Sequence, residues 1–502
     1  MLGLLLLLVL SVGLLYLPAV QTYVAKTTVN QLFAKDEVDF ELQELDITPF
    51  SSVKFHGLFL SDKNHDTLVY ANSIEIRLTD WMLSPINFRF DSVGVDSLKF
   101  YLSTAEGDSN LNLQFVIDRF VSNKEDTNAA EFDLAIEKVS LSSIYFKWDD
   151  FNQPDTGFGV NFNHLNVAHL NGDLGQLVIS DNEISAQIDT LRLTEKSGLQ
   201  IDQISTDIVL NDDIIDLKKL LIQTPQTYLA GQYAMKHNNY QGFSDYVKRV
   251  EMTAVLDSTV INSADISYFV PQLEGMKEIV SIDGEYNGTV SSFEMPRFRI
   301  GYGTSTYLVG KLDIHGLPEI NSTQMNIYLD KGYVLKADLT RIPLPPFSDN
   351  QTLDLPQQLN KWRYAKIDGK YIGTIKNFIA DAQFRTNLGT IISDVQVSNK
   401  GVNSTYQGAV DFNSLQMGNL LNNNDFDLVS GSLKIKGKGT DARTADVLAK
   451  GRIRAFDFRN YRYNNIALDG EFKDRMFIGQ LDVNDPNCQL GFNGALNFQP
   501  HQ

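Results

Sequence analysis

Cysteine is almost absent from this chain, since Cys488 is the only one in 502 residues. A single thiol excludes an intrachain disulfide and cannot build a cysteine-based zinc site. Basic charge is also scarce, because 43 Lys and Arg residues stand against 62 Asp and Glu, which gives a net charge of -19. Nucleic-acid binding requires a positive surface, so we expect no nucleic-acid partner. Stability has to come from apolar burial and from hydrogen bonds between strands.

Loops for phosphate or dinucleotide binding are missing as well. The glycine-rich "GSLKIKGKGTDA" from Gly431 departs from the spacing of a phosphate loop, and glycine replaces the Ser or Thr that follows the lysine. The segment "GYGTSTYLVG" from Gly301 breaks the dinucleotide fingerprint at its third glycine. Neither segment therefore predicts a nucleotide cofactor.

Residues suited to metal or acid/base chemistry are scattered. His164 and His169 stand five residues apart in a predicted strand or turn, so their side chains should point to opposite faces. The adjacent carboxylates Asp212 and Asp213 suit a solvated turn better than a metal or acid/base pair. We therefore expect no enzyme, no metal site and no cofactor.

The longest uncharged run lies at the amino terminus. Residues 2–20 begin "LGLLLLLVLSVGLLYLP", which as a helix is long enough to cross a hydrocarbon core of about 30 Å. A cleaved signal peptide is the alternative, but its apolar region usually has about 7–15 residues after a basic start. This run is longer and has no basic start, so we expect an uncleaved anchor with a connecting helix at 1–35. Without a basic flank the charges do not orient it.

The segment "VKFHGLFLSDKNHDTLVYANSIEIRL", residues 53–78, contains a pattern that recurs along the chain. Apolar and polar residues alternate up to Phe55, as in a strand with one buried face, and resume on the opposite parity from Leu58. One extra residue at Gly57 would restore a continuous apolar face, so we predict a glycine-marked β-bulge there. A turn and a second alternating strand follow, which predicts a hairpin with one apolar face.

Similar alternation predicts strands through most of the chain. The strand signals, named by their apolar residues, are Val38/Phe40/Leu42, Val93/Val95, Leu98/Phe100/Leu102, Leu111/Leu113/Phe115, Phe132/Leu134/Ile136, Phe158/Val160/Phe162 and Ile184/Ala186/Ile188. Short helices are expected at 81–86, 115–121 and 263–273, a polar loop at 122–131 and a proline-rich crossing at 341–358. The β-rich segments are then 36–122, 132–340 and 359–502.

Two longer segments repeat each other. "PQLEGMKEIVSIDGEYNGTV" from Pro271 and "PQQLNKWRYAKIDGKYIGTI" from Pro356 share the core Ile-Asp-Gly-x-Tyr-x-Gly-Thr, which starts at Ile282 and at Ile367. A looser unit with glycine among apolar residues recurs in "YLAGQYAM", "YLVGKLDI", "ALDGEFKD" and "FIGQLDV". Glycine within a strand marks a bulge or bends the sheet, so these spacings predict a sheet that curves along its length.

The order of these segments resembles a known family. The apolar anchor, the hairpin at 53–78, "SNLNLQFVIDRF", "LLIQTPQTYLAGQY" and "YRYNNIALDGEFKDRMFIGQLDVNDPNCQLGFNGALNF" resemble the amino-terminal part of TamB-like proteins of the AsmA superfamily, in the form seen in Bacteroidota. The resemblance covers essentially the whole chain. It implies a mostly β fold: an N-terminal transmembrane helix followed by an elongated β-sheet that curls into a half-open apolar groove, a β-taco similar to eukaryotic bridge-like lipid-transfer proteins.

The same resemblance implies a location and one departure. Such proteins are held in the inner membrane by one helix, with the bulk of the chain in the periplasm. They usually continue to a carboxy-terminal domain directed at the outer membrane, whereas this chain stops at "NFQPHQ". We expect either that the groove segment 359–502 continues beyond the chain end or that its last sheet edge meets a partner.

Two functions follow as hypotheses. In the first, the apolar face carries phospholipids between the inner and outer membranes. In the second, the protein is an assembly factor that pairs a sheet edge with strands of an outer-membrane β-barrel protein. A chain of β-sandwiches with packed apolar faces is the structural alternative. The residues predicted to line the groove are Phe132, Leu134, Ile136, Phe158, Val160, Phe162, Ile184 and Ile188.

Overall fold

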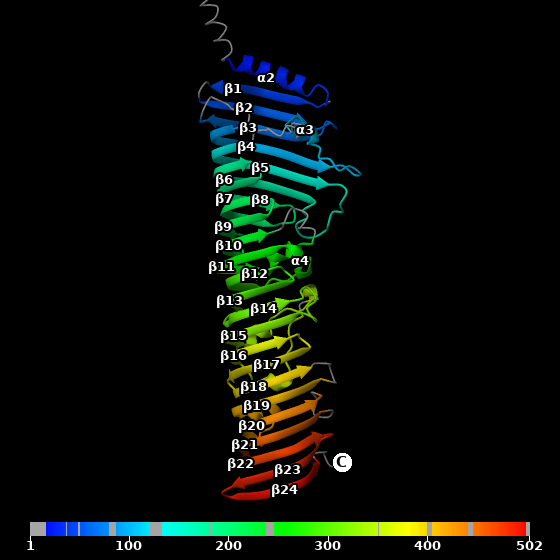
Figure 1. Cartoon of the computed structure of the whole chain (residues 1–502), viewed down its shortest axis with the longest axis vertical. Helices are drawn as coiled ribbons and strands as arrows, with labels where there is room; N and C mark the ends of the chain where they lie inside the picture. The colour runs from blue at the N-terminus through cyan, green and yellow to red at the C-terminus, as the bar shows by residue number, and fades with distance from the viewer. Residues whose placement is uncertain are drawn as a thin grey trace, which may run out of the picture. The chain divides into compact units, whose positions relative to one another are not determined.

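The protein is mostly β (Figure 1). The computed structural model describes residues 17–36, 38–48, 51–79, 87–120, 133–180, 182–236, 245–349, 351–398, 404–439 and 445–497. These ranges contain 24 strands that belong to one largely antiparallel sheet, so the β-rich class expected from the sequence is confirmed. The chain divides into two compact units, Met1–Gln241 with Thr259–Lys277 (unit 1) and Gly242–Ser258 with Glu278–Gln502 (unit 2).

In unit 1, each strand from β1 to β10 is hydrogen-bonded to the next along the chain. The strands are β1 (Phe40–Thr48), β2 (Ser52–Ser61), β3 (Thr67–Leu78), β4 (Asn87–Thr104), β5 (Asp133–Asp150), β6 (His164–Ser180), β7 (Glu183–Glu195), β8 (Gln200–Asn211), β9 (Ile214–Gln223) and β10 (Tyr228–Lys236). Only β4 and β5 run parallel. A parallel pair needs a crossover rather than a hairpin turn, and the intervening chain contains α3 (Gln114–Phe120).

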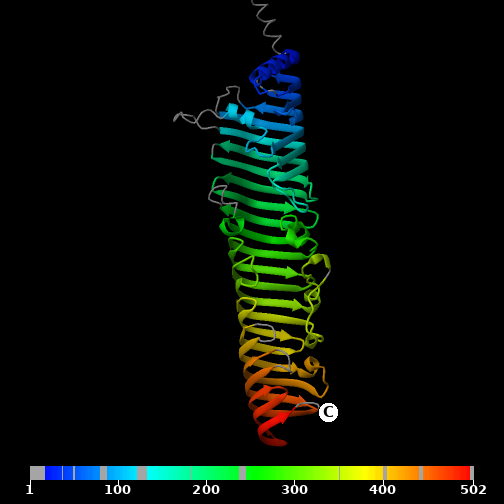
Figure 2. The same cartoon turned by 90° about the vertical axis from the view of Figure 1, so that its right-hand side faces the viewer.

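Unit 2 contains strands that also pair in chain order, coloured green to red in Figure 2. They are β12 (Ile279–Gly288), β13 (Ser292–Tyr302), β14 (Thr306–His315), β15 (Gln324–Leu335), β16 (Tyr364–Gly373), β17 (Asn377–Thr386), β18 (Gly389–Ser398), β19 (Thr405–Gln416), β20 (Phe426–Lys438), β21 (Asp446–Phe458), β22 (Tyr461–Lys473), β23 (Met476–Asp485) and β24 (Cys488–Asn497). Strand β11 (Glu251–Asn262) has residues in both units.

Helices are few and mostly short. They are α2 (Pro18–Leu32), α4 (Tyr246–Arg249), α5 (Ser263–Ser267), α6 (Lys336–Leu339), α7 (Met417–Leu421) and the 3-10 turns η2 (Pro271–Leu273), η3 (Phe347–Asp349) and η4 (Gln357–Leu359). The predicted connecting helix is confirmed as α2. Residues 1–16 of the predicted anchor lie outside the described ranges. Within those ranges, no helix has the length and apolar character needed to cross a membrane.

Helix α2 lies against the edge strand β1. The Thr22 hydroxyl accepts a hydrogen bond from the Leu45 N–H at 2.8 Å. The Gln21 side chain accepts one from the Ile47 N–H at 2.7 Å and donates one to the Ile47 carbonyl at 3.2 Å. An open strand edge invites pairing with another strand, and these two side chains occupy backbone groups that such a strand would use.

The phase slip predicted at Gly57 is confirmed, but the neighbouring strands share it. Gly57 has a left-handed backbone with φ of 61° inside β2. The register with β1 and β3 does not change across this residue. The reason is that the spacing between successive inward-facing apolar residues increases from two to three residues at the same place in the neighbouring strands. In β1 this occurs from Leu42 to Leu45, and in β3 from Ala71 to Ile74. The expectation of one extra residue relative to the partner strands is therefore wrong.

Most other left-handed residues within strands of unit 1 are not glycine. We call each such residue a bulge where the apolar residues of the strand change parity. Ser97, Ser143, His169 and Lys219 have left-handed φ values of 54°, 55°, 53° and 52° inside β4, β5, β6 and β9. At each of them the buried and half-buried apolar side chains step by three residues. The N–H of Ser143 donates to the Asn171 Oδ1 at 3.0 Å, so a polar side chain of the neighbouring strand satisfies it. A bulge bends its strand, and the register between β4 and β5 places Ser97 and Ser143 at matching positions.

Two predicted strands are wrong. Residues 111–115 form a turn that enters α3, so the helical expectation for 115–121 is the correct one there. Residues 158–162 alternate apolar and other residues but lie in a loop between β5 and β6. The predicted helix at 81–86 and the polar loop at 122–131 lie outside the described residues. The helical turns expected at 263–273 are confirmed as α5 and η2.

Candidate functional site

One face of the unit 2 sheet is apolar along its strands. Because the side chains of antiparallel partner residues point to the same face, the registers between strands define rows of side chains that run from strand to strand. From β16 to β24 the two central rows are Ile367, Phe384, Ile391, Phe412, Gly431, Ile453, Ile466, Val483, Leu490 and Gly369, Ala382, Ser393, Val410, Leu433, Gly451, Leu468, Leu481, Phe492.

Two more rows lie beside these. They are Tyr371, Ala380, Val395, Gly408, Ile435, Ala449, Gly470, Gly479, Gly494 and Gly373, Phe378, Val397, Tyr406, Gly437, Val447, Phe472, Phe477, Leu496. We call the four rows together the apolar rows. Apart from two tyrosine hydroxyls, the only polar side chain in them is Ser393. The Ser393 hydroxyl lies within hydrogen-bond distance of the Ala380 and Ala382 carbonyls, at 3.5 and 3.3 Å, so it is turned to the backbone.

Side chains in the middle of the apolar rows are only half-buried. Leu433, Ile435, Val447, Leu468 and Leu481 all retain solvent exposure although strands flank them on both sides. A second layer packed on this face would bury central aliphatic side chains almost completely. The half-burial therefore indicates a face that neighbouring strands cover only in part.

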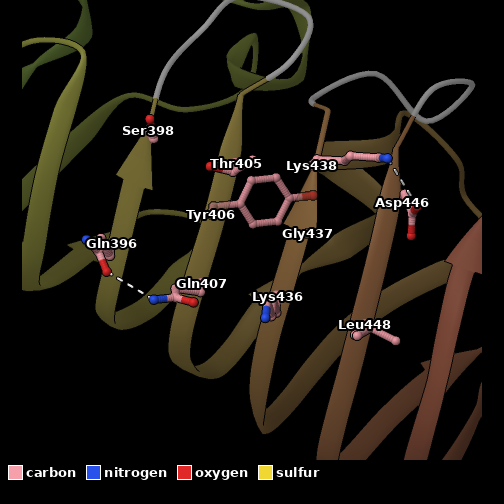
Figure 3. Close-up of a pocket in the computed structure, with 10 residues that line it drawn as sticks. All are labelled: Gln396, Ser398, Thr405, Tyr406, Gln407, Lys436, Gly437, Lys438, Asp446 and Leu448. Carbon is pink, nitrogen blue, oxygen red and sulfur yellow. Dashed lines mark hydrogen bonds and ion pairs between the residues drawn. The ribbon is translucent and has the colours of Figure 1, made fainter.

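Aromatic rings in the apolar rows lie over glycines of the next strand. A Cβ at Gly437 would stand 3.0 Å from ring atoms of Tyr406, whose ring reaches across from β19 to β20 in Figure 3. A Cβ at Gly470 would stand 2.5 Å from the Phe477 ring. Glycine thus lets a ring lie flat against the sheet instead of standing upright from it.

The sequence repeat builds the same hairpin twice. Tyr286 stacks on Phe293 with ring centroids 4.8 Å apart, and Tyr371 stacks on Phe378 at 4.9 Å. Both tyrosine hydroxyls donate to the carbonyl of the threonine three residues on, at 2.8 Å. Burial raises the pKa of Tyr286 to about 12, so this hydroxyl remains neutral at physiological pH.

The opposite face of the same strands is polar and paired. Arg385 binds Asp368 at 2.5 Å, and Lys370 binds Asp381 at 3.1 Å. The opposite face therefore carries ion pairs that the apolar rows lack, although single exposed apolar side chains such as Ile392 and Leu448 also lie on it.

An open hollow of about 520 Å³ across β18–β21, shown in Figure 3, is lined mainly by residues of the polar face, together with Tyr406 and Gly437 of the apolar rows. Its polar side chains pair with one another: Gln407 donates to Gln396 at 3.0 Å, and Lys438 lies 3.7 Å from Asp446. Because this hollow is open to water and most of its lining side chains are polar, we place the candidate site on the apolar rows.

The structure brings together four of the residues predicted to line a groove. Leu134 and Ile136 lie on β5, and Ile184 and Ile188 lie on β7, all on one face of the unit 1 sheet. The register joins Leu134 to Ile184 through Ile179 of β6. Ile136 is 8% exposed and Ile184 is 39% exposed, so this face runs from a buried centre to an open margin. Phe132 lies outside the described residues.

The other three predicted residues do not join this face. Phe158, Val160 and Phe162 lie in the loop between β5 and β6, which docks on the chain after α5. Phe158 stacks on Tyr268 with centroids 6.4 Å apart, and the Val160 N–H donates to the Tyr268 carbonyl at 2.7 Å. Phe162 is 67% exposed and stacks on Phe269. Sequence reasoning also missed the apolar rows of unit 2, whose alternation after residue 364 was the available signal.

Buried carboxylates hold strand ends in unit 2. Asp338 is 1% exposed and accepts five hydrogen bonds from the turn between β13 and β14, from Thr304, Ser305 and Thr306. Burial alone would raise its pKa, but these donors outweigh it and hold the pKa far below the usual range. Asp485 accepts from the Tyr461 hydroxyl at 2.5 Å, and this bond and its other donors lower its pKa to about 2.

A histidine holds the start of the β5–β6 loop in unit 1. His164 Nε2 lies 2.8 Å from the Gln153 carbonyl and Nδ1 lies 3.0 Å from an Asp149 carboxylate oxygen. Both partners are acceptors, so both ring nitrogens donate only in the protonated ring. The carbonyl first and the carboxylate second raise the pKa of His164. The other histidine considered, His169, is an exposed bulge residue.

Among the described residues, no group of three or more His, Cys, Asp or Glu side chains is placed to hold a metal ion. Asp212 and Asp213 are exposed in the turn between β8 and β9, as expected. Comparison with protein-family models, with curated proteins and with solved structures finds no match to this chain.

Proposed function

We propose that the protein binds phospholipid acyl chains on its apolar sheet face and transports phospholipids between the inner and outer membranes. The continuity of the apolar rows is the observation that carries this proposal. An acyl chain needs an apolar surface without polar interruption, and the one serine in the rows has its hydroxyl turned to backbone carbonyls. The curled, half-open groove that the family resemblance implies would place these rows on its inner wall.

The energetics favour such a surface. Each buried methylene contributes about 0.8 kcal/mol, so half-burying an acyl chain of about 16 carbons contributes roughly 6 kcal/mol. Half-exposed side chains such as Leu433 and Leu468 lose their remaining water contact at the same time. The head group stays in water at the open side. Desorption of the lipid into water is then the step that the protein bypasses.

Anchoring in the inner membrane, with the bulk of the chain in the periplasm, belongs to the same proposal. It rests on the uncharged run at 2–20 and on the family resemblance. Helix α2 exposes Tyr23 and Val24, 71% and 52%, directly after that run. Exposed tyrosine and valine next to an apolar segment suit the boundary between lipid and water.

Photo-crosslinking in the full chain tests the lipid proposal. A crosslinking residue replaces Leu468 of the apolar rows, and a matched variant carries it at the preceding Ala467 on the opposite face. Lipid captured at residue 468 but not at 467, identified by mass spectrometry, is the expected result. Leu433→Asp should reduce the lipid that copurifies, whereas Ser432→Asp should not, because only the first places a charge in the apolar rows.

The same experiment separates the second candidate function. Equal lipid capture at 467 and 468 would contradict the lipid proposal. Capture of unfolded strands of an outer-membrane barrel protein, concentrated at β24, would favour the assembly factor instead. One feature bears on that hypothesis: α2 contacts the backbone of β1 through side-chain hydrogen bonds, whereas among the described strands β24 pairs with β23.

A further inference from the structure

Strands β20 and β21 carry positive charge in a chain whose net charge is -19. Their paired segments, 430–438 and 446–455, contain one acidic residue, Asp446, among several cations. The cations are Lys434, Lys436, Lys438, Lys450, Arg452 and Arg454. Each of them alternates with a residue of the apolar rows, so all six belong to the polar face.

Four of these cations have no ion pair among the described residues. Arg454 donates instead to the Phe412 carbonyl at 3.3 Å, and the other three are Lys434, Lys436 and Arg452. Lys434 stands opposite Ala409 on one side and Lys450 on the other. Like charges directly opposite each other destabilise a strand pair. Only Lys450 is compensated, by Asp469 at 2.7 Å. A bound anion would relieve this repulsion.

The surface around these cations is hollowed. A hollow of about 620 Å³ is lined by Lys434, Lys450 and Arg452, with Gly451 and Ala467 providing little side-chain bulk. Two carboxylates also line it: Asp469, which pairs with Lys450, and Asp482. Lys436 lines the neighbouring hollow shown in Figure 3. The hollows leave room for a bound polypeptide to contact the strands directly.

The spacing of the cations indicates what fits. Along each strand they recur at every second residue, a distance of about 6.8 Å. An extended polypeptide with Asp or Glu at alternate positions has the same spacing. We propose that Lys434, Lys436, Lys450 and Arg452, the basic surface, bind an extended acidic segment of a partner protein. The basic surface lies opposite the apolar rows, so this proposal does not depend on lipid binding.

Peptide binding to the full chain in detergent tests the proposal. One labelled peptide alternates Glu and Ser, and a second has the same composition with all Glu residues in one block. The alternating peptide should bind more tightly, and salt should weaken it. The triple variant Lys434→Gln, Lys436→Gln and Arg452→Gln should weaken binding by about tenfold, as expected for three modest charge pairs.

A matched control carries Lys331→Gln, Lys366→Gln and Lys376→Gln, which removes the same charge from exposed positions elsewhere in unit 2. Its affinity for the alternating peptide should change by less than about twofold. Equal binding of both peptides, or equal loss in both triple variants, would overturn the proposal. Tighter binding of phosphatidylglycerol vesicles than of the alternating peptide, lost in the first variant, would assign the surface to membrane phosphates instead.

Discussion

Unit 1 and strands β16–β18 of unit 2 keep one face apolar by different means, although other strands of unit 2 contain register shifts as well. In unit 1 the apolar residues change parity within nearly every strand, at bulges whose left-handed residue is usually Ser, His or Lys rather than glycine. In β16–β18 of unit 2 the rows continue without a step, and in β19–β23 glycines lie under rings of neighbouring strands. The first arrangement bends strands at fixed positions, and the second keeps rings flat on the sheet. Continuity of an apolar face therefore does not require regular alternation in the sequence.

The substitution Gly408→Ala should cause the largest loss of stability. Its Cβ would stand 2.0 Å from the Asp394 carbonyl oxygen, at a φ of +151°. Strands β18 and β19 would have to separate, which should destabilise unit 2 by about 3 kcal/mol. Hydrogen exchange of β17–β20 under urea measures this. Gly494→Ala, in the same row with no contact closer than 3.4 Å, should cost less than about 1 kcal/mol. Equal effects of the two changes would refute the packing role of Gly408.

The substitution Asp338→Asn should destabilise unit 2 by about 2 kcal/mol. The amide carries no negative charge and has only one oxygen to accept hydrogen bonds from the five donors that surround it. The matched change is Asp330→Asn on β15, at an exposed carboxylate, and should have little effect. Protection of the β13–β14 turn from hydrogen exchange reports the difference. Unchanged protection in Asp338→Asn would show that the turn holds without the carboxylate.

Acid should weaken unit 2 through Asp485. Its pKa is lowered from 3.8 to about 2, so its stabilising contribution is fully present above about pH 4 and is lost as pH falls through 2. Asp485→Asn should be less stable at neutral pH and should show a flatter pH profile between 4 and 2. Hydrogen exchange of β22 and β23, measured between pH 4 and 2, gives the pH profile of stability. Identical profiles for wild type and Asp485→Asn would contradict the role of Asp485.

Unit 1 should respond to pH in the opposite direction through His164. Its pKa is raised above 6.5, so the contribution of the protonated ring is full below pH 6.5 and is lost as pH rises through the raised value. The β5–β6 loop should then become more sensitive to proteolysis in wild type. His164→Gln should be sensitive at all pH values, because the amide cannot donate to both acceptors. A pH-independent wild type would exclude this contact as the cause.

The smallest expected effect is a gain in stability at a bulge of unit 1. Ser97 adopts a left-handed backbone that costs a non-glycine residue about 1–2 kcal/mol, while glycine costs about 0.5–1 kcal/mol in the unfolded chain. Ser97→Gly should therefore stabilise β4 by about 0.5 kcal/mol, whereas Ser97→Val should destabilise it. Urea unfolding distinguishes the two signs. Stabilisation by valine would mean that the bulge is not strained.

Much of the fold was predictable because alternation is local. The hairpin at 53–78, the slip at Gly57 and the two-copy repeat all appear in the structure. Bulges without glycine could not be found by searching for glycine, although a step of three between apolar residues marks them, as at Ser97 and Ser143. That step is visible in the sequence and would have found the bulges of unit 1.

The errors have physical causes. Residues 158–162 alternate as a strand does, but their apolar side chains pack on the chain after α5 instead of pairing with strands. Alternation reports that side chains are apolar and leaves open what they pack against. The apolar rows depend on the register between strands, and register follows from turn lengths and bulges that composition does not show. The sequence therefore predicted that the sheet has an apolar face more accurately than it predicted which residues line that face.

Pairing of each strand with its predecessor in the chain also has a consequence for folding and for length. Each strand of β16–β19 pairs with the next strand in the chain, which favours folding that proceeds hairpin by hairpin as the chain leaves the ribosome. Removing a whole hairpin, such as β17 with β18, would leave β16 facing β19 with the same strand directions. The length of such a sheet can then change in steps of two strands while the apolar face stays in phase, so chains of different reach could arise from one structural plan.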